Sequence, residues 1–341
     1  TRSNRPAFLP GRWLTTAGSS ARTPATAPPD PPNTPACPDC ARVGLARNSD
    51  IAKAVQTAVE LAGGLGAIKP GQKVVIKPNI TGTSKDFITH PEVIRGIILA
   101  VATRTEPKNI TIAECTALGA NTRSNARTTG VLPLVEEMGA NFLCFDEGNY
   151  VSFRDAKWKH ITDEKRVPES LRNGQFDHFI NAPILKDHTV GNAGYTCCFK
   201  NFVGLLPYSG SGSRMSSNIH TADIAEKAAE LGLIVPTITM NIVDATTPGL
   251  VDGPTPTTIA DAGGLILAST DRVACDSVAV AILKCYAKKL NVTGSYVGKS
   301  VFAQPQIVRA AELGLGISDP QRIQIRAQDV DNLADIMAQW V

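Results

Sequence analysis

Short runs rich in β-branched residues alternate with helical stretches along the chain from residue 49 onward. Strands are predicted at residues 73–80, 109–115, 141–147, 177–185, 238–246 and 264–270. Helices are predicted around them, at residues 51–64, 91–104, 132–140, 222–233, 272–290 and 306–316. This alternation is typical of a largely parallel sheet covered by helices. The sequence therefore predicts an α/β fold.

The composition agrees with a globular protein. The chain has 341 residues, of which 43% are hydrophobic and 19% are charged. A chain of this length can bury one large core or two ordinary ones. Its longest apolar run, residues 96–102, is much shorter than the ~20 residues that a helix needs to cross a bilayer. We therefore expect no membrane span.

The first 48 residues differ in character from the rest of the chain. Nine of the 23 prolines lie within residues 1–40, which show no helical or strand period. Residues 1–48 carry six arginines against two aspartates, a charge of +4, which leaves −1 for the rest of the +3 chain. The sequence thus predicts an extended, proline-rich, basic arm at residues 1–48 and an α/β domain at residues 49–341. Neither part has the dense positive charge that phosphate backbones require, so we expect no nucleic-acid partner.

Such an arm can connect neighbouring copies of the protein. At ~3.1 Å per residue it reaches on the order of 120 Å, whereas a globule of ~300 residues has a radius of gyration of ~19 Å. We therefore expect residues 1–45 to contact another copy, which gives a filament unless the contacts close into a ring. An arm that folds back on its own domain is the alternative.

Eight cysteines divide into two groups. Cys37 and Cys40 form C-P-D-C in the arm, and the other six are dispersed through the domain. A single C-x-x-C motif is a weak metal signal, because a structural zinc site needs four ligands. We expect Cys37 or Cys40 to form a disulfide, either with each other or with other cysteines. A disulfide, together with a first residue, Thr1, that is not methionine, leads us to expect an extracytoplasmic or secreted protein.

Polar side chains gather after the predicted strands and at the helix starts that follow them. They are Lys77, Asn79, His90, Lys186, His188, Lys200, Asn201 and His220. Lys186 and His188 are expected in a loop after strand 177–185, and Lys200 and Asn201 on a short helix after that loop. Because the carboxyl ends of parallel strands meet at one edge of a sheet, we expect these side chains to line one cleft.

These residue types suit more than one chemistry. Lysines that follow several strands of one sheet can neutralise an anionic ligand, and a desolvated lysine can act as a nucleophile or base. His188 and His220 are candidate metal ligands, since neutral imidazole is a common donor. The alternative for each histidine is a structural hydrogen bond to a loop carbonyl.

Two aspartates and a cysteine pair have structural explanations. Asp271 is expected to cap helix 272–290. Asp276 lies inside an otherwise apolar helix, so we expect it to pair with one of the lysines or histidines. Cys197 and Cys198 are expected to pack in the core rather than to bind a metal, because adjacent side chains diverge on a helix.

A series of motifs resembles one known family. In order along the chain they are IKPNI, THPEV, INAPILKDH, CFKNFVGLLP, His220, IVDATTPGLVDGPTP, LASTDRVACDSVAV and AAELGLG. Together they resemble DUF362, a family of uncharacterised α/β proteins, over about residues 50–327. The resemblance implies a polar cleft formed by Lys77, Asn79, His90, Lys186, His188, Lys200, Asn201, His220, Asp271 and Asp276. Many members carry a four-cysteine ferredoxin-like insert; this chain lacks it, so we expect no iron–sulfur cluster.

Two functions follow from these features. The first is an extracytoplasmic protein that assembles with other copies through its arm and retains a Lys/His/Asp cleft. The second is an enzyme or binding protein that acts in that cleft on a small anionic or metal-containing ligand. The sequence names neither the ligand nor a catalytic residue, so enzyme activity stays open.

Overall fold

The computed structural model describes residues 37, 39–116, 121–207 and 219–340. The chain divides into two compact units, residues 1–36 and residues 37–341. The predicted arm falls mostly in the first unit, outside the described residues, so its extended conformation stays a prediction. All elements below belong to the second unit.

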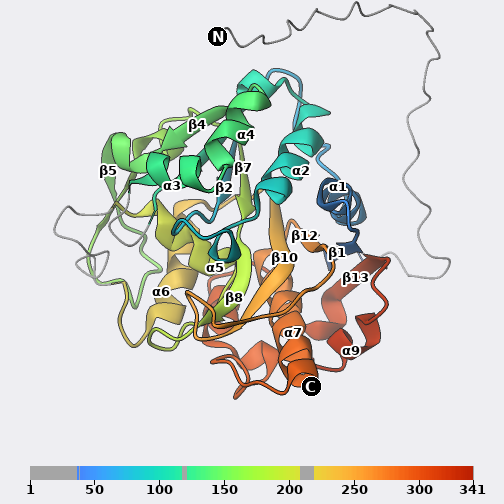
Figure 1. Cartoon of the computed structure of the whole chain (residues 1–341). Coiled ribbons are helices and arrows are strands. Elements are labelled where there is room, and N and C mark those ends of the chain that lie inside the picture. The colour runs from blue at the N-terminus through green and yellow to red at the C-terminus, as the bar shows by residue number, and fades with distance from the viewer. Residues whose placement is uncertain (1–36, 38, 117–120, 208–218, 341) are drawn as a thin grey trace, which may run out of the picture. The chain divides into compact units, whose positions relative to one another are not determined.

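A largely parallel sheet forms the centre of this unit (Figure 1). Its main path has the order β13-β1-β12-β10-β7-β2-β3-β4, and among these neighbours only β12 runs antiparallel to the strands beside it. The prediction of a parallel α/β sheet is confirmed. The strands of this path are β1 (Ala41–Arg47), β2 (Val74–Pro78), β3 (Ile110–Glu114), β4 (Asn141–Cys144), β7 (His178–Ala182), β10 (Met240–Val251), β12 (Leu265–Ser269) and β13 (Ile323–Gln328).

Further strands extend the sheet beyond this path. β8 (Ile184–His188) pairs in parallel with β10, and β9 (Gly194–Thr196) pairs antiparallel with β8. β11 (Thr258–Ile259) lies antiparallel to β10. β5 (Tyr150–Phe153) and β6 (Lys165–Pro168) form a separate two-stranded sheet.

Helices form near the predicted positions. They are α1 (Ile51–Leu61), α2 (Pro91–Ala102), α3 (Thr122–Thr128), α4 (Val131–Glu137), α5 (Cys198–Asn201), α6 (Ile224–Leu231), α7 (Arg272–Leu290), α8 (Pro305–Glu312) and α9 (Leu333–Met337). The cap of α7 is also as predicted, since the Asp271 carboxylate accepts hydrogen bonds from Ala274 N at 2.8 Å and Ile317 N at 2.9 Å. Among the helices of the described residues, none is both long and apolar enough to cross a bilayer.

Two hydrophobic cores cover the two faces of the sheet. Successive strand residues point to opposite faces, and on β2 this places Val74 and Ile76 in one core and Val75 in the other. The first core is closed by α1, α2 and α4, and the second by α5, α6, α7 and α8. A sheet buried on both faces explains why its strands are apolar throughout instead of alternating with polar residues.

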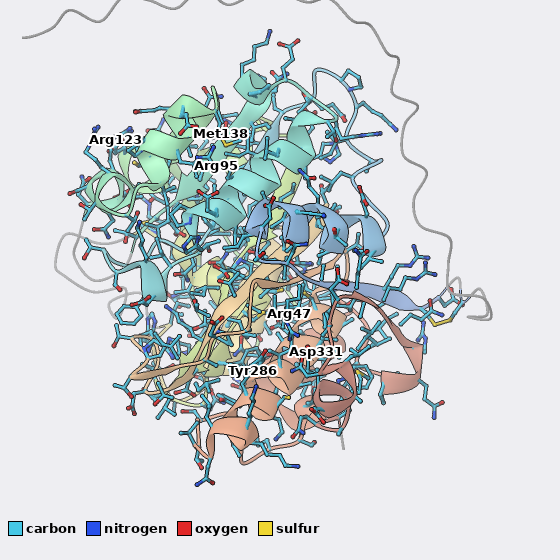
Figure 2. All side chains as sticks on the ribbon, turned by 45° about the vertical axis from the view of Figure 1, so that its right-hand side comes forward. Arg47, Arg95, Arg123, Met138, Tyr286 and Asp331 are labelled. Carbon is cyan, nitrogen blue, oxygen red and sulfur yellow. A yellow bond between two sulfur atoms is a disulfide. The ribbon has the colours of Figure 1, made fainter. Side chains whose placement is uncertain are left out.

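The predicted boundary between arm and domain, at residue 48, is wrong. Residues 41–47 form β1, which pairs with both β12 and β13 inside the sheet. Gly44 lets α1 approach closely, because a Cβ there would collide with the carbonyl oxygen of Ala58. At the end of β1, the Arg47 guanidinium forms an ion pair with Asp331 and donates to the Tyr286 hydroxyl at 3.3 Å, which ties β1 to the C-terminal segment (Figure 2).

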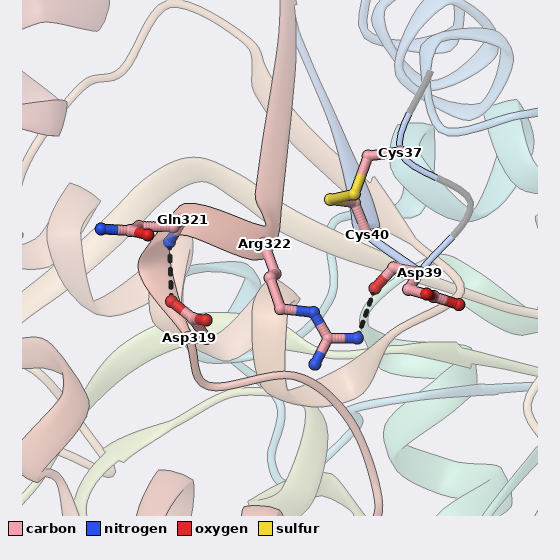
Figure 3. The surroundings of a disulfide bond; sticks show 6 residues. All are labelled: Cys37, Asp39, Cys40, Asp319, Gln321 and Arg322. Carbon is pink, nitrogen blue, oxygen red and sulfur yellow. Dashed lines mark hydrogen bonds between the residues drawn. A yellow bond between two sulfur atoms is a disulfide. The ribbon is translucent and has the colours of Figure 1, made fainter. Parts of the chain in front are cut away.

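The predicted disulfide is present just before β1. Cys37 and Cys40 are bonded to each other, so of the two alternatives the small local loop is correct. Within this loop the carbonyl oxygen of Asp39 accepts a hydrogen bond from the Arg322 guanidinium at 2.7 Å (Figure 3). The other six cysteines are buried.

The predicted strand at residues 177–185 is two strands. It breaks at Pro183, after which the chain leaves β2 and continues as β8 along β10. The carbonyl of Pro183 accepts a hydrogen bond from Asp244 N at 2.8 Å, which holds the break against β10. Lys186 and His188 therefore lie on a buried strand and not in the predicted loop.

Two truncations test the revised boundary. Deleting residues 1–36 should leave the thermal stability of the domain almost unchanged, since it removes no element of the second unit. Deleting residues 1–47 should prevent cooperative folding, because the edges of β12 and β13 lose their partner and an exposed strand edge promotes aggregation. Thermal unfolding followed by circular dichroism compares the two; equal melting temperatures would show that β1 is dispensable.

Candidate functional site

A buried ion pair lies at the carboxyl edge of the sheet. The Lys77 amine, on β2, is 2.8 Å from a carboxylate oxygen of Glu114, on β3, and both side chains are almost fully buried. The amine also donates to the Asn201 side chain at 3.2 Å. Lys77 and Asn201, two of the predicted site residues, are therefore in contact. The partner that neutralises Lys77 is Glu114, a residue at a strand end that the predicted site omits.

Asparagine side chains continue this network across the sheet. Asn201 Nδ2 donates to Asn181 Oδ1 at 2.8 Å, and Asn181 Nδ2 donates to Asn241 Oδ1 at 3.1 Å and to the carbonyl of Cys198 at 3.1 Å. The chain of amides links β2, β7 and β10 to α5. Buried polar groups need such partners, so we interpret Lys77 and Asn201 as the support that fixes α5 in place.

A second group of polar residues includes Lys200, the neighbour of Asn201 on α5. We name Lys186, His188, Lys200 and His220 the Lys/His cluster. The Lys200 amine is 3.5 Å from His220 Nε2, and the rings of His188 and His220 stack with their centroids 6.4 Å apart. Three of the four side chains are buried, and His220 is partly exposed. These residues come from β8, from α5 and from the segment before α6, so the fold brings together four of the predicted site residues.

Burial and mutual repulsion set the charges in this cluster. Burial lowers the pKa of Lys186 to about 7, and its amine donates to the carbonyl oxygen of Phe87 at 2.7 Å. Burial also lowers the pKa of His188 strongly, and the positive charges of Lys200, His220 and Lys186 lower it further. Like charges at close range disfavour the charged forms. An anion in the cluster would reverse this effect.

The hydrogen bonding of His188 argues against the predicted metal-ligand role. Its Nδ1 accepts a hydrogen bond from Val190 N at 3.3 Å. In a neutral imidazole the other nitrogen, Nε2, then carries the proton and is a donor. A donor suits an anion, whereas a metal requires an unprotonated nitrogen.

His90 and Asn79 have local partners. His90 is the N-cap of α2: its Nδ1 accepts from Glu92 N at 3.2 Å, and its own N–H donates to Asp244 at 2.7 Å. Asn79 Oδ1 accepts from the Thr81 hydroxyl at 3.1 Å. These contacts are those of a turn and a helix cap.

The predicted partner of Asp276 is wrong. Its carboxylate accepts hydrogen bonds from the Tyr195 hydroxyl at 3.1 Å and from Cys198 N at 2.9 Å, not from a lysine or histidine. α7 packs beneath the start of α5, so the carboxylate meets the first N–H group of that helix. Burial raises the pKa of Asp276.

The expectation that the side chains of Cys197 and Cys198 diverge is also wrong. Their Sγ atoms are 3.9 Å apart. The reason is that Cys197 is not helical: it is the N-cap of α5, with φ −156° and ψ −139°. Both thiols and the Asp276 carboxylate have ligand atoms within 4.8 Å of one another.

Surface hollows occur elsewhere on the domain. Two of them, of about 380 and 180 Å³, lie beside β4, and neither is lined by a predicted site residue. The Lys/His cluster thus lies outside both hollows.

The fold and the polar network together define an α/β protein whose sheet is covered by helices on both faces. Its buried cationic groups lie where the parallel strands end. The family model for a domain of unknown function, DUF362, matches residues 74–281, more than half of the chain. The protein belongs to the DUF362 family, and the matched region contains Lys77, Asp276 and the Lys/His cluster.

Comparisons with individual proteins add little. No curated protein matches the chain. Among solved structures, the crystal structure of a protein from Thermotoga maritima is similar over 62% of this chain and 54% of its own, with 10% identity and a TM-score of 0.33. The chain thus spans about half the length of that protein.

The buried ion pair gives a stability prediction. Glu114→Gln removes the counter-charge of Lys77 and should lower the free energy of unfolding by about 3 to 5 kcal/mol, because it leaves a buried charge uncompensated. Adding Lys77→Met should restore much of the loss. Glu137→Gln is the control, since Glu137 pairs with Arg95 at the surface and exposed pairs contribute little. Urea titrations measure the free energy of unfolding of the three variants. Equal losses in Glu114→Gln and Glu137→Gln would contradict the structural role of the buried ion pair.

Proposed function

We propose that the domain binds a small anionic ligand at the Lys/His cluster. The observation that carries the proposal is the convergence of two lysines and two histidines: the Lys200 amine is 3.5 Å from His220 Nε2, and the rings of His188 and His220 stack. Burial lowers the pKa of His188, and the charges of Lys200, His220 and Lys186 lower it further. Positive charges gathered in this way attract an anion.

The geometry limits the kind of ligand. Lys186, His188 and Lys200 are at most 7% exposed, so only a compact group such as a carboxylate or phosphate fits among them. Lys186 and Lys200 supply ammonium donors, and His188 supplies its Nε2–H. A lysine with a pKa near 7 can also accept a proton or attack a carbonyl carbon, so the site has a group suited to chemistry on the bound anion.

Anion binding should depend on pH in a defined direction. Lys186 is protonated below pH 7 and loses its charge above it, so affinity should fall as the pH rises from 7, by up to about tenfold per unit. Isothermal titration with inorganic phosphate and with oxalate, at pH 6 and pH 8, measures the effect.

Variants localise the binding. Lys186→Met and Lys200→Met should each weaken binding by at least about tenfold, and Lys186→Met should abolish the pH dependence. Lys284→Met is the matched control, because Lys284 is a half-buried lysine that donates to the carbonyls of Val297 and Lys299. Unchanged affinity in both cluster variants, or an equal loss in Lys284→Met, would refute the proposed site.

Self-assembly through the arm and export from the cytoplasm are further proposals. The arm that we propose for assembly is shorter than the one predicted from the sequence. Since β1 is occupied within its own sheet, the segment available to contact another copy is residues 1–36, which still reach about 110 Å when extended. The support is the proline-rich composition of this segment. The Cys37–Cys40 disulfide supports an oxidising, extracytoplasmic compartment.

Each of these two proposals has its own test. Deleting residues 1–36 should convert an assembled particle to a monomer in sedimentation experiments; a particle of unchanged size would reject assembly through the arm. Alkylation of the protein unfolded without reductant should modify the other six cysteines, which are buried in the fold, and spare Cys37 and Cys40. Eight modified thiols would count against the oxidising compartment.

A further inference from the structure

We propose that Cys197, Cys198 and Asp276 form a buried Zn²⁺ site that is separate from the Lys/His cluster. The ligand atoms of the three residues all lie within 4.8 Å of one another, and the two Sγ atoms are 3.9 Å apart. A tetrahedral zinc with Zn–S bonds of ~2.3 Å places two sulfur ligands about 3.8 Å apart. The thiols therefore already have the spacing that zinc requires.

The local backbone produces this spacing. β9 ends at Thr196, Cys197 has a non-helical conformation, and the helix begins only at Cys198. Two neighbouring side chains can converge at such a corner, although they could not do so within a helix. α7 brings Asp276 to the same point from a distant part of the chain.

Two thiolates and one carboxylate give the metal three protein ligands, and zinc accepts both sulfur and carboxylate oxygen. The carboxylate oxygen favours Zn²⁺ over Cu(I), which selects sulfur ligands.

The surroundings fit a site with net negative charge. The Tyr195 hydroxyl and Cys198 N–H donate to Asp276, as groups that orient metal ligands commonly do. The Arg272 guanidinium is buried and donates to the carbonyls of Gly232, Val235 and Pro236. Burial lowers the pKa of Arg272 to about 10, while the charges of Cys198, Asp271 and Asp276 oppose this change, so Arg272 is close enough to balance the charge of the site.

Burial determines how the metal enters and what it displaces. Cys197, Cys198 and Asp276 are all fully buried, so zinc is bound as the chain folds. Burial raises the pKa of Cys197, Cys198 and Asp276, and zinc binding displaces the protons of the two thiols.

The first test is the metal content of the full-length chain. The protein is produced and refolded with Zn²⁺ and reductant, dialysed, and analysed by atomic emission. We expect about one zinc per chain, and we expect Co²⁺ in place of zinc to give thiolate-to-cobalt charge-transfer absorption. A wild-type chain without zinc, or with Cys197 and Cys198 joined in a disulfide, overturns the proposal.

Variants give the second test. Cys198→Ser and Asp276→Asn should lose the zinc, whereas Cys115→Ser, a change at another buried cysteine, should keep it. Tyr195→Phe retains every ligand and should weaken zinc affinity by about 10- to 100-fold, which a purely structural hydroxyl would not do. Full zinc binding in Asp276→Asn, or unchanged affinity in Tyr195→Phe, overturns the proposed site. The wild-type cobalt spectrum and the Tyr195→Phe affinity remain decisive if the ligand variants do not fold.

Discussion

The buried ion pair between Lys77 and Glu114 is the interaction on which the rest of the site depends. A charge in the middle of a doubly covered sheet is tolerated only with a counter-charge and further hydrogen bonds. Lys77 obtains both, from Glu114 on the next strand and from Asn201 on α5. The same contacts that neutralise the lysine therefore fix a four-residue helix that could not be stable by itself.

α5 connects the two regions for which we propose ligands. Lys200 belongs to the Lys/His cluster, and Cys198 belongs to the thiol group around Asp276. Residues two positions apart on a helix point to different sides, so one short helix serves both regions. The asparagine chain through Asn181 anchors this helix to the sheet at the carbonyl of Cys198. In an oxidising compartment, zinc on the thiols would also protect them from oxidation.

The sequence predicted the fold class well and the connections poorly. Regular apolar runs identify the central strands and the helices, because burial of both faces of a sheet demands them. The strand β1 was missed: residues 41–47 contain a single β-branched residue and follow a proline-rich segment, and their strand conformation comes from pairing with β12 and β13. The break at Pro183 was also missed, because the strand that holds β8 after the break, β10, lies more than fifty residues further along the chain.

By itself the sequence determined which residue types stand at the strand ends, and hence that lysines, histidines and asparagines gather at one edge of the sheet. Only the tertiary structure decided how they divide: Lys77 is neutralised by Glu114, His90 caps α2, Asp276 joins the cysteines, and the remaining cations form the Lys/His cluster. The physical reason is that a buried polar group is paired with whichever partner lies within about 3 Å. That distance depends on the packing of α5 and α7 against the sheet, which local sequence does not encode.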